Sequence, residues 1–311
     1  MIVVFTGGTG GAKLVQGLQQ VVAPEDLTVI VNTGDDLEWW GLHVSPDVDS
    51  VLYALAGLLS ADRGWGIDGD SFRCLDRMKQ LGEPSWFSLG DLDLATHLAR
   101  TTMLRAGKTL TEATAALAQK LRVRARVLPM SNDRVSTMLE TENGTLTFQE
   151  YFVRERYQVG VQAVRFEGAE QARPAPGVIE SIKQAQSIIF APSNPVTSIG
   201  PILAVPGVRD ALRRSDAAVA AVSPIVGGAA VSGPAGQLMQ MMGWPCSISG
   251  VAKAYEDFLD ILIVDKADEN EARGWSNETI RVCCTKTVMR SADDKRALAQ
   301  CVLDVCSTTV S

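Results

Sequence analysis

The chain has 311 residues, of which 46% are hydrophobic and 21% charged, a composition typical of globular proteins. Its formal net charge of -7 argues against a polynucleotide partner, because nucleic-acid binders carry a basic surface that neutralises phosphates. No apolar stretch reaches the roughly 18 residues that a membrane helix requires, and the first residues lack the features of a signal peptide. We therefore expect a cytoplasmic protein without a nucleic-acid or membrane partner, whose six cysteines are reduced.

Five short apolar segments predict the strands of one sheet. The first segment runs into the glycines of residues 7–11, and helical spacing follows over residues 12–20. Because the segments are continuously apolar, they favour a parallel sheet covered on both faces, an α/β fold of the Rossmann-like, doubly wound type. Ligands of such sheets bind beyond the carboxyl ends of the strands, where this sequence places its polar and glycine-rich clusters. The predicted strands span residues 2–5, 27–31, 187–191, 217–222 and 259–264.

The pattern changes between the second and third of these strands. We interpret residues 62–176 as a mainly helical insertion that forms a second lobe and contributes to the substrate site. It includes a predicted helix over residues 94–105 and a capping box at Thr109 and Glu112. Residues 1–61 and 177–311 then form a nucleotide-binding domain. After about residue 268 the sequence predicts an edge strand over 282–289 and a last helix beginning near Ser291, with no assigned function.

The glycine loop is close to two phosphate-binding motifs and matches neither. Lys13 stands where the dinucleotide motif G-x-G-x-x-G needs its third glycine, which weighs against a nicotinamide dehydrogenase. Leu14 stands where a P-loop needs the Ser or Thr that holds magnesium. Glycines between a strand and a helix still let backbone N–H groups approach an anion at the positive end of the helix dipole. We expect this loop to bind a phosphate; the alternative is a plain tight turn. The expected contacts are Gly8, Thr9, Gly10, Gly11 and Lys13.

Four aspartates follow the second predicted strand: Asp35, Asp36, Asp47 and Asp49. Carboxylates gathered at a strand end hold divalent cations, and such a cation would neutralise a bound diphosphate. In the alternative interpretation, Asp35 and Asp36 solvate a loop or cap a helix, and Asp49 is the N-cap of a helix over residues 51–58.

Three further segments have candidate binding residues. Residues 86–93, with Trp39 and Trp40, offer aromatic rings to a flat ligand, although aromatic residues in such segments are more often core. The nearby His97 is more often a buried histidine than a catalytic base. Residues 148–154 place charges around aromatic rings, and Asn194 in the turn Pro192-Ser-Asn-Pro195 offers both a donor and an acceptor to a purine edge.

Taken in order, these motifs resemble the 2-phospho-L-lactate transferase family, CofD, which is called FbiA in mycobacteria. No single motif is decisive, but the ordered set is highly specific. The matching segments are residues 6–13, 31–36, 41–49, 89–97, 148–154, 192–195, 198–207 and 223–228.

The resemblance implies a magnesium-dependent step of coenzyme F420 biosynthesis. A guanosine diphosphate-linked donor would pass its phospho-three-carbon-acid group, of the 2-phospholactate, phosphoenolpyruvate or 3-phosphoglycerate type, to the ribityl hydroxyl of the deazaflavin Fo and release GMP. The family also implies a homodimer. A related family of non-catalytic, nucleotide-sugar-binding regulators shares the fold and is the alternative.

The resemblance places the guanine nucleotide at the glycine loop and at Asn194, and places Asp49 at the Fo hydroxyl and the metal. Attack of an alcohol on a diphosphate requires in-line positioning and charge neutralisation. We therefore predict Asp49 and Asp36 as catalytic residues and as magnesium ligands. The other predicted substrate contacts are Asn32, Asp35, His43, Ser88, Asp91 and Ser198.

Overall fold

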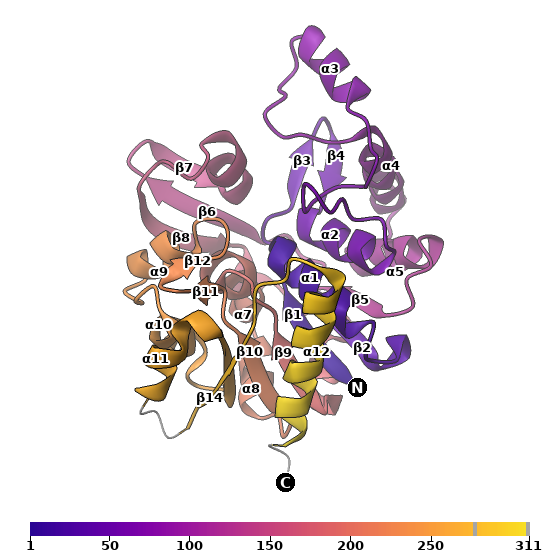
Figure 1. Cartoon of the computed structure of the whole chain (residues 1–311). Helices are drawn as coiled ribbons and strands as arrows, with labels where there is room; N and C mark the ends of the chain where they lie inside the picture. The colour runs from indigo at the N-terminus through magenta and orange to yellow at the C-terminus, as the bar shows by residue number, and fades with distance from the viewer. Residues whose placement is uncertain (276–278, 309–311) are drawn as a thin grey trace.

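The protein is built around a seven-stranded parallel sheet with the order β14-β13-β10-β9-β1-β2-β5 (Figure 1). The computed structural model describes residues 1–275 and 279–308. The predicted doubly wound α/β fold is confirmed, and the five predicted strands are all present. The strands are β1 (Ile2–Thr6), β2 (Leu27–Val31), β5 (Arg126–Pro129), β9 (Ser187–Phe190), β10 (Ala218–Val222), β13 (Ile261–Asp265) and β14 (Arg281–Thr285).

The strand order reverses at β1. From β1 the chain moves outward through β2 to β5, and it then returns to β9 on the other side of β1. Ile2 accordingly pairs with Leu27 of β2 and with Ser187 of β9, both in parallel register. The loops that follow β1 and β9 leave the sheet at this switch point, where doubly wound folds bind their ligands.

Helices cover both faces of the sheet, as continuous burial of the strands requires. Because successive side chains of a strand alternate, Val4 of β1 lies in one hydrophobic core while Val3 and Phe5 lie in the other. The first core is covered by α1 (Gly8–Leu18), α2 (Pro46–Leu55), α5 (Leu110–Lys120) and α12 (Ala292–Ser307). The second is covered by α6 (Val178–Gln184), α7 (Gly200–Ala204), α8 (Val208–Arg213), α9 (Ala235–Met241) and α10 (Ile248–Tyr255).

The segment predicted as a mainly helical insertion, residues 62–176, has α-helices only in its first half. Its helices are α3 (Arg73–Gln80), α4 (Asp91–Arg105) and α5, which begins with the predicted Thr109 and Glu112 capping box. The chain then joins the main sheet as β5 and continues into a three-stranded antiparallel sheet with the order β7-β6-β8. Alternating burial along β6 explains the difference, because one face of this small sheet is exposed. Its strands are β6 (Ser136–Thr141), β7 (Gly144–Thr147) and β8 (Val161–Glu167).

The remaining elements are short. Edge strand β14 ends at Thr285, earlier than predicted, and α12 begins with a capping box of Ser291 and Asp294. All six cysteines are free. In the described part of the chain, no helix has the length and hydrophobicity needed to cross a membrane. The short pieces are β3 (Leu37–Trp39), β4 (Leu42–Val44), β11 (Ile225–Val226), β12 (Ala229–Ala230), α11 (Glu269–Arg273), three 3₁₀ turns (Pro24–Asp26, Ala169–Gln171, Lys266–Asp268) and two π-helical turns (Glu150–Arg154, Pro195–Ile199).

Candidate functional site

A cavity of about 950 Å³ lies at the carboxyl ends of the central strands. Its walls come from the glycine loop after β1, the start of α2, the loop after β9 and the first turn of α12. Of the predicted site residues, those that line the cavity are Gly8, Thr9, Gly10, Lys13, Asp35, Asp49, Ser88, Asn194 and Ser198. Those that do not line it are Gly11, Asn32, Asp36, His43 and Asp91.

The loops after β1 and β9 are fixed to each other at the switch point. The Ser193 hydroxyl accepts a hydrogen bond from the Gly7 N–H at 3.3 Å and donates one to the Gly7 carbonyl at 2.7 Å. A side chain at Gly10 would lie 2.5 Å from the carbonyl oxygen of Pro192, so the two backbones approach closely. The Asn194 side chain accepts a hydrogen bond from the Val196 N–H at 3.0 Å, which shapes the turn that follows.

Asp47 lies at the N-terminus of α1, where the sequence predicts a phosphate. Its carboxylate accepts a hydrogen bond from the Gly8 N–H at 2.7 Å. The buried Asn32 amide donates to Asp47 and to Asp35, at 3.0 Å in each case, and its own oxygen accepts from the Gly34 N–H at 2.8 Å. Asn32 is therefore a support behind the site rather than part of the cavity wall.

The Asp35 and Asp47 carboxyl groups have no cationic partner in the described part of the chain. Burial raises the pKa of Asp47 to about 6. Burial and then the negative charge of Asp47 raise the pKa of Asp35 well above its ordinary value. In residues 1–275 and 279–308 neither carboxylate makes an ion pair, although both line the cavity. Their electrostatics suit a bound cation.

Asp36 already has its own partners. One oxygen of its carboxylate lies 3.0 Å from the His43 Nε2, and the other accepts a hydrogen bond from the Ser45 hydroxyl at 2.7 Å. Burial raises its pKa, although the hydrogen bond from His43 acts in the opposite direction. The structure thus brings Asp36 together with His43 and separates both from the cavity wall.

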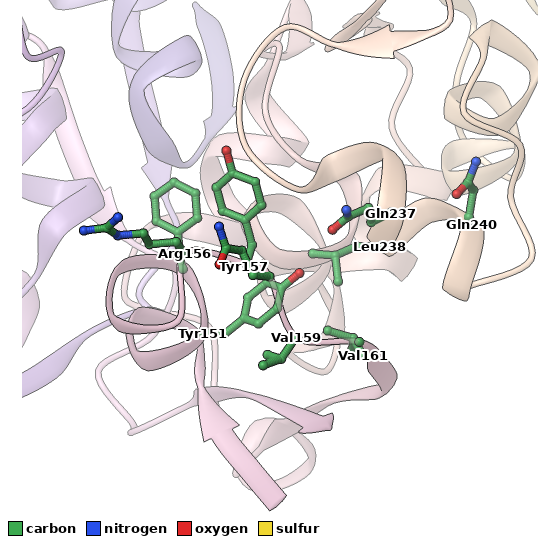
Figure 2. Close-up of a pocket in the computed structure, with 11 residues that line it drawn as sticks. Tyr151, Arg156, Tyr157, Val159, Val161, Gln237, Leu238 and Gln240 are labelled. Atoms are coloured by element: carbon green, nitrogen blue, oxygen red, sulfur yellow. The ribbon is translucent and has the colours of Figure 1, made fainter. Parts of the chain in front are cut away.

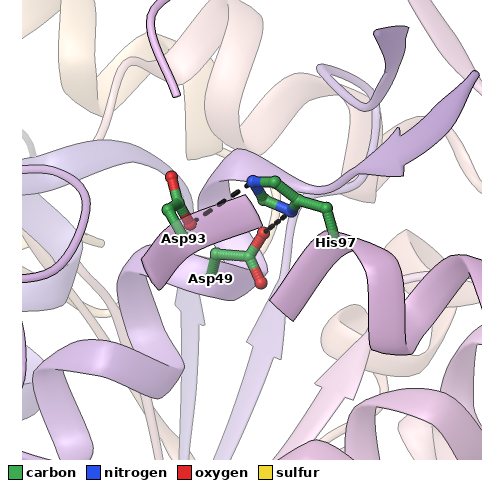
Figure 3. Close-up of side chains that lie close together, drawn as sticks. All are labelled: Asp49, Asp93 and His97. Atoms are coloured by element: carbon green, nitrogen blue, oxygen red, sulfur yellow. Dashed lines mark ion pairs between the residues drawn. The ribbon is translucent and has the colours of Figure 1, made fainter. Parts of the chain in front are cut away.

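Asp49 belongs to a buried network between α2 and α4. Both terminal nitrogens of the fully buried Arg100 contact its carboxylate, one of them at 3.0 Å. His97 lies between two carboxylates, with Nδ1 3.5 Å from Asp49 and Nε2 3.3 Å from Asp93 (Figure 3). The Tyr53 hydroxyl donates to Asp93 at 2.6 Å. Asp49 is not the helix N-cap considered from the sequence, because Ser45 holds that position in α2.

Asp91 holds a loop rather than facing the cavity. Its carboxylate accepts hydrogen bonds from the Ser71 hydroxyl at 2.5 Å and from the backbone N–H groups of Arg73 and Cys74 at 3.1 and 2.9 Å. The Ser71 hydrogen bond is the main reason that its pKa lies below the ordinary value. Ser88, three residues earlier, does line the cavity.

The model of the family "2-phospho-L-lactate transferase CofD" matches residues 2–302. The chain belongs to the CofD family. It is 40% identical over 302 residues to the 2-phospho-L-lactate transferase of Methanosarcina mazei, covering 97% of this chain and 99% of the relative. It is 43% identical over 310 residues to the phosphoenolpyruvate transferase of Streptomyces griseus, covering 98% of each. The protein is accordingly an enzyme of the transferase class.

Solved structures agree on the fold of this CofD family member. The chain resembles the UPF0052 family protein BH3568 from Bacillus halodurans, with a TM-score of 0.65 and 19% sequence identity over 97% of this chain and 99% of that one. At this identity the likeness concerns the fold alone.

Several residues around the CofD cavity were missed or discounted in the sequence. Asp47, which the sequence places in the carboxylate cluster but not among the assigned site residues, lines the cavity and belongs to the same Pro-Asp-x-Asp segment as Asp49. His97 is buried, as expected from the sequence, and its side chain also lines the cavity beside Asp49. Arg290 and Lys295 come from the C-terminal segment and also line the cavity. No local pattern marks these two, because only the packing of α12 brings them to the site.

The aromatic residues divide between the cavity and a small core. Trp39 and Trp86 pack edge to face with ring centroids 4.8 Å apart, as the core interpretation predicts. Phe87, Phe148 and Phe152 line the cavity and offer apolar surface to a ligand. A second pocket, of about 770 Å³, lies between residues 151–161 and α9 (Figure 2). Tyr151 and Phe152 of the predicted segment 148–154 line this second pocket, whereas none of the individually predicted site residues does.

Proposed function

We propose that this enzyme transfers a phospho-three-carbon-acid group, of the 2-phospholactate, phosphoenolpyruvate or 3-phosphoglycerate type, from a guanosine diphosphate-linked donor to the ribityl hydroxyl of Fo. GMP is the leaving group, and the product belongs to coenzyme F420 biosynthesis. The observation that carries the proposal is the meeting of the glycine loop, the loop after β9 and the carboxylates of Asp47 and Asp49 in one cavity. About 950 Å³ is at the upper end of the usual range for ligand pockets, as a two-substrate reaction requires. We expect the enzyme to work in the cytoplasm as a homodimer.

In the proposed reaction the Fo hydroxyl oxygen attacks the phosphorus that carries the three-carbon acid. A new P–O bond forms, the bond between this phosphorus and the bridging oxygen breaks, and the electron pair leaves with GMP. The hydroxyl proton passes to a carboxylate or to water. Asp49 is the best-placed group to orient the hydroxyl, because Arg100 and His97 fix its position at the cavity wall.

Magnesium fits the pair Asp47 and Asp35 better than the predicted pair Asp36 and Asp49. Asp35 and Asp47 line the cavity and, in the part of the chain described, have no cationic partner, whereas Asp36 contacts His43 and Asp49 contacts Arg100. The ligand atoms of Asp49, Asp93 and His97 lie within 4.8 Å of one another, but Arg100 already supplies positive charge there. When bound, magnesium would neutralise the diphosphate of the donor.

Mass spectrometry of GMP and of the deazaflavin product tests the proposal. The purified protein is incubated with Fo, magnesium and each of the three guanylated donors. We expect GMP release with at least one donor, and a loss of at least about a hundredfold in Asp49→Asn, in line with the removal of one transition-state contact.

Asp216→Asn is the matched control, because this carboxylate is exposed and does not line the cavity. It should keep the wild-type rate. If the wild type releases no GMP from any of the donors, the proposed reaction is wrong. If Asp49→Asn is fully active, Asp49 has no part in the mechanism.

A further inference from the structure

The C-terminal helix α12 packs directly against α1, the helix that follows the glycine loop (Figure 1). A side chain at Gly17 of α1 would lie 2.1 Å from the carbonyl oxygen of Lys295, so the helices are in close contact. The Lys295 ammonium group donates to the Gln16 side-chain oxygen at 2.7 Å. This packing brings Lys295 to the cavity wall, beside Lys13 of α1.

Lys13 and Lys295 face the cavity without an acidic partner. In residues 1–275 and 279–308 neither ammonium group makes an ion pair, and the only side-chain partner of Lys295 is the neutral amide of Gln16. The two groups are close enough that the charge of Lys13, after burial, lowers the pKa of Lys295. Arg290, five residues before Lys295, also lines the cavity. Like charges held together in this way are stabilised when an anion binds between them.

The ionisable groups of the cavity are therefore divided by element. Carboxylates come from the end of β2, from α2 and from α4, as Asp35, Asp47, Asp49 and Asp93. Ammonium groups come from α1 and α12, as Lys13 and Lys295, and guanidinium groups come from two loops, as Arg63 and Arg290. A donor with an anionic diphosphate and an anionic carboxylate is attracted to the α1 and α12 wall and is repelled by the carboxylates unless a metal intervenes.

We infer that Lys295, together with Lys13, forms an anion subsite for an oxyanion group of the donor, either its diphosphate or the carboxylate of its three-carbon acid. The nature of the donor rests on the proposed function. Lys13 was already a candidate from the glycine loop, whereas Lys295 gives a role to the C-terminal segment. In this arrangement α12 is a wall of the active site as well as a cover of the sheet.

Substitution of Lys295 tests the subsite. Lys295→Gln removes the charge, Lys295→Arg keeps it, and Arg296→Gln removes an equal charge from the exposed neighbour that does not line the cavity. We expect Lys295→Gln to raise the KM for the donor at least about tenfold, as the loss of a charge-assisted hydrogen bond predicts, with the KM for Fo unchanged. Lys295→Arg should recover most of the affinity, which a purely structural defect would not allow.

Isothermal titration with GDP identifies the group that is bound. A tenfold loss of GDP affinity in Lys295→Gln assigns the subsite to the diphosphate, whereas an unchanged GDP affinity with a raised donor KM assigns it to the carboxylate. If Lys295→Gln matches Arg296→Gln in GDP affinity and in donor KM, the inference is wrong. GDP titration needs no turnover, so a failure of the proposed reaction is distinguished from a failure of a subsite that binds the diphosphate.

Discussion

The Asp49 carboxylate and the Arg100 guanidinium form a two-pronged ion pair inside the protein, and Arg100 is completely buried. The pair joins α2, which begins beside the glycine loop, to α4, which comes from a different part of the chain. His97 contacts the same carboxylate from α4. The position of the proposed catalytic group is thus set by a helix 51 residues away in sequence.

Removal of Arg100 alone should therefore lower the free energy of unfolding more than removal of Arg100 and Asp49 together. Arg100→Met leaves the Asp49 carboxylate buried without its cation, which costs about 3 to 5 kcal/mol in similar pairs. The double variant Asp49→Asn, Arg100→Met should recover part of this loss. Urea unfolding measures both, with Arg214→Met as the control, because Arg214 is exposed and makes no ion pair among the residues described. Equal stability of the single and double variants would show that the pair is not coupled.

The central sheet and the position of the site at its carboxyl edge could be predicted, because both depend on local sequence patterns. Continuous apolar segments indicated β1, β2, β9, β10 and β13, and parallel strands bring the loops at their carboxyl ends to one edge. Strand β5 escaped prediction because its sequence, Arg-Val-Leu-Pro, has four residues and becomes a strand only by pairing with β2. Strands β6 to β8 belong to an exposed sheet, so they lack a continuous apolar run.

The roles of individual aspartates could not be predicted in the same way. Asp35 and Asp36 are neighbours in sequence, yet one lines the cavity and the other binds His43 and Ser45. Hydrogen bonds from distant residues decide this, and no local pattern reports them. Lys295 is a stronger case, since its contact with Gln16 joins residues near opposite ends of the chain.

Replacement of Asn32 by aspartate, which has nearly the same shape, should destabilise the protein. The nitrogen of its buried amide donates to the carboxylates of Asp35 and Asp47, at 3.0 Å in each case. Asn32→Asp would place a third carboxylate among them and remove two hydrogen bonds, at a cost of more than about 2 kcal/mol. Thermal unfolding without metal should show a clearly lower Tm. Asn143→Asp, in the exposed turn between β6 and β7, is the matched control and should leave the Tm unchanged.

The raised pKa of Asp47 predicts how the stability of the metal-free protein depends on pH. Burial raises this pKa from its ordinary value to about 6, so the folded state holds the proton more tightly than the unfolded state. Stability should then fall as pH rises from about 4 to about 6, by on the order of 2 kcal/mol from this group. The raised pKa values of Asp35 and Asp36 act in the same direction.

Urea unfolding in the presence of a chelator, at several pH values, measures this dependence. Asp47→Asn should flatten the curve between about pH 4 and about pH 6, because the titrating carboxyl is gone. An unchanged slope in this variant would contradict the assignment to Asp47. Asp216→Asn, on an exposed loop, should reproduce the wild-type curve.

Gly10 should tolerate no side chain, because the loop after β9 lies against it. A methyl group at this position would lie 2.5 Å from the Pro192 carbonyl oxygen, which is backbone and cannot move without shifting the loop. Gly10→Ala should push the start of α1 away from the end of β9, lower stability by about 1 to 3 kcal/mol and weaken GDP binding at least about tenfold. Gly160→Ala is the matched control, since nothing lies within 4 Å of the added methyl group, and it should be neutral or slightly stabilising. Isothermal titration with GDP measures the affinity of both variants, and urea unfolding measures their stability. Wild-type GDP affinity in Gly10→Ala would mean that the close approach of the two loops is not needed to bind the nucleotide.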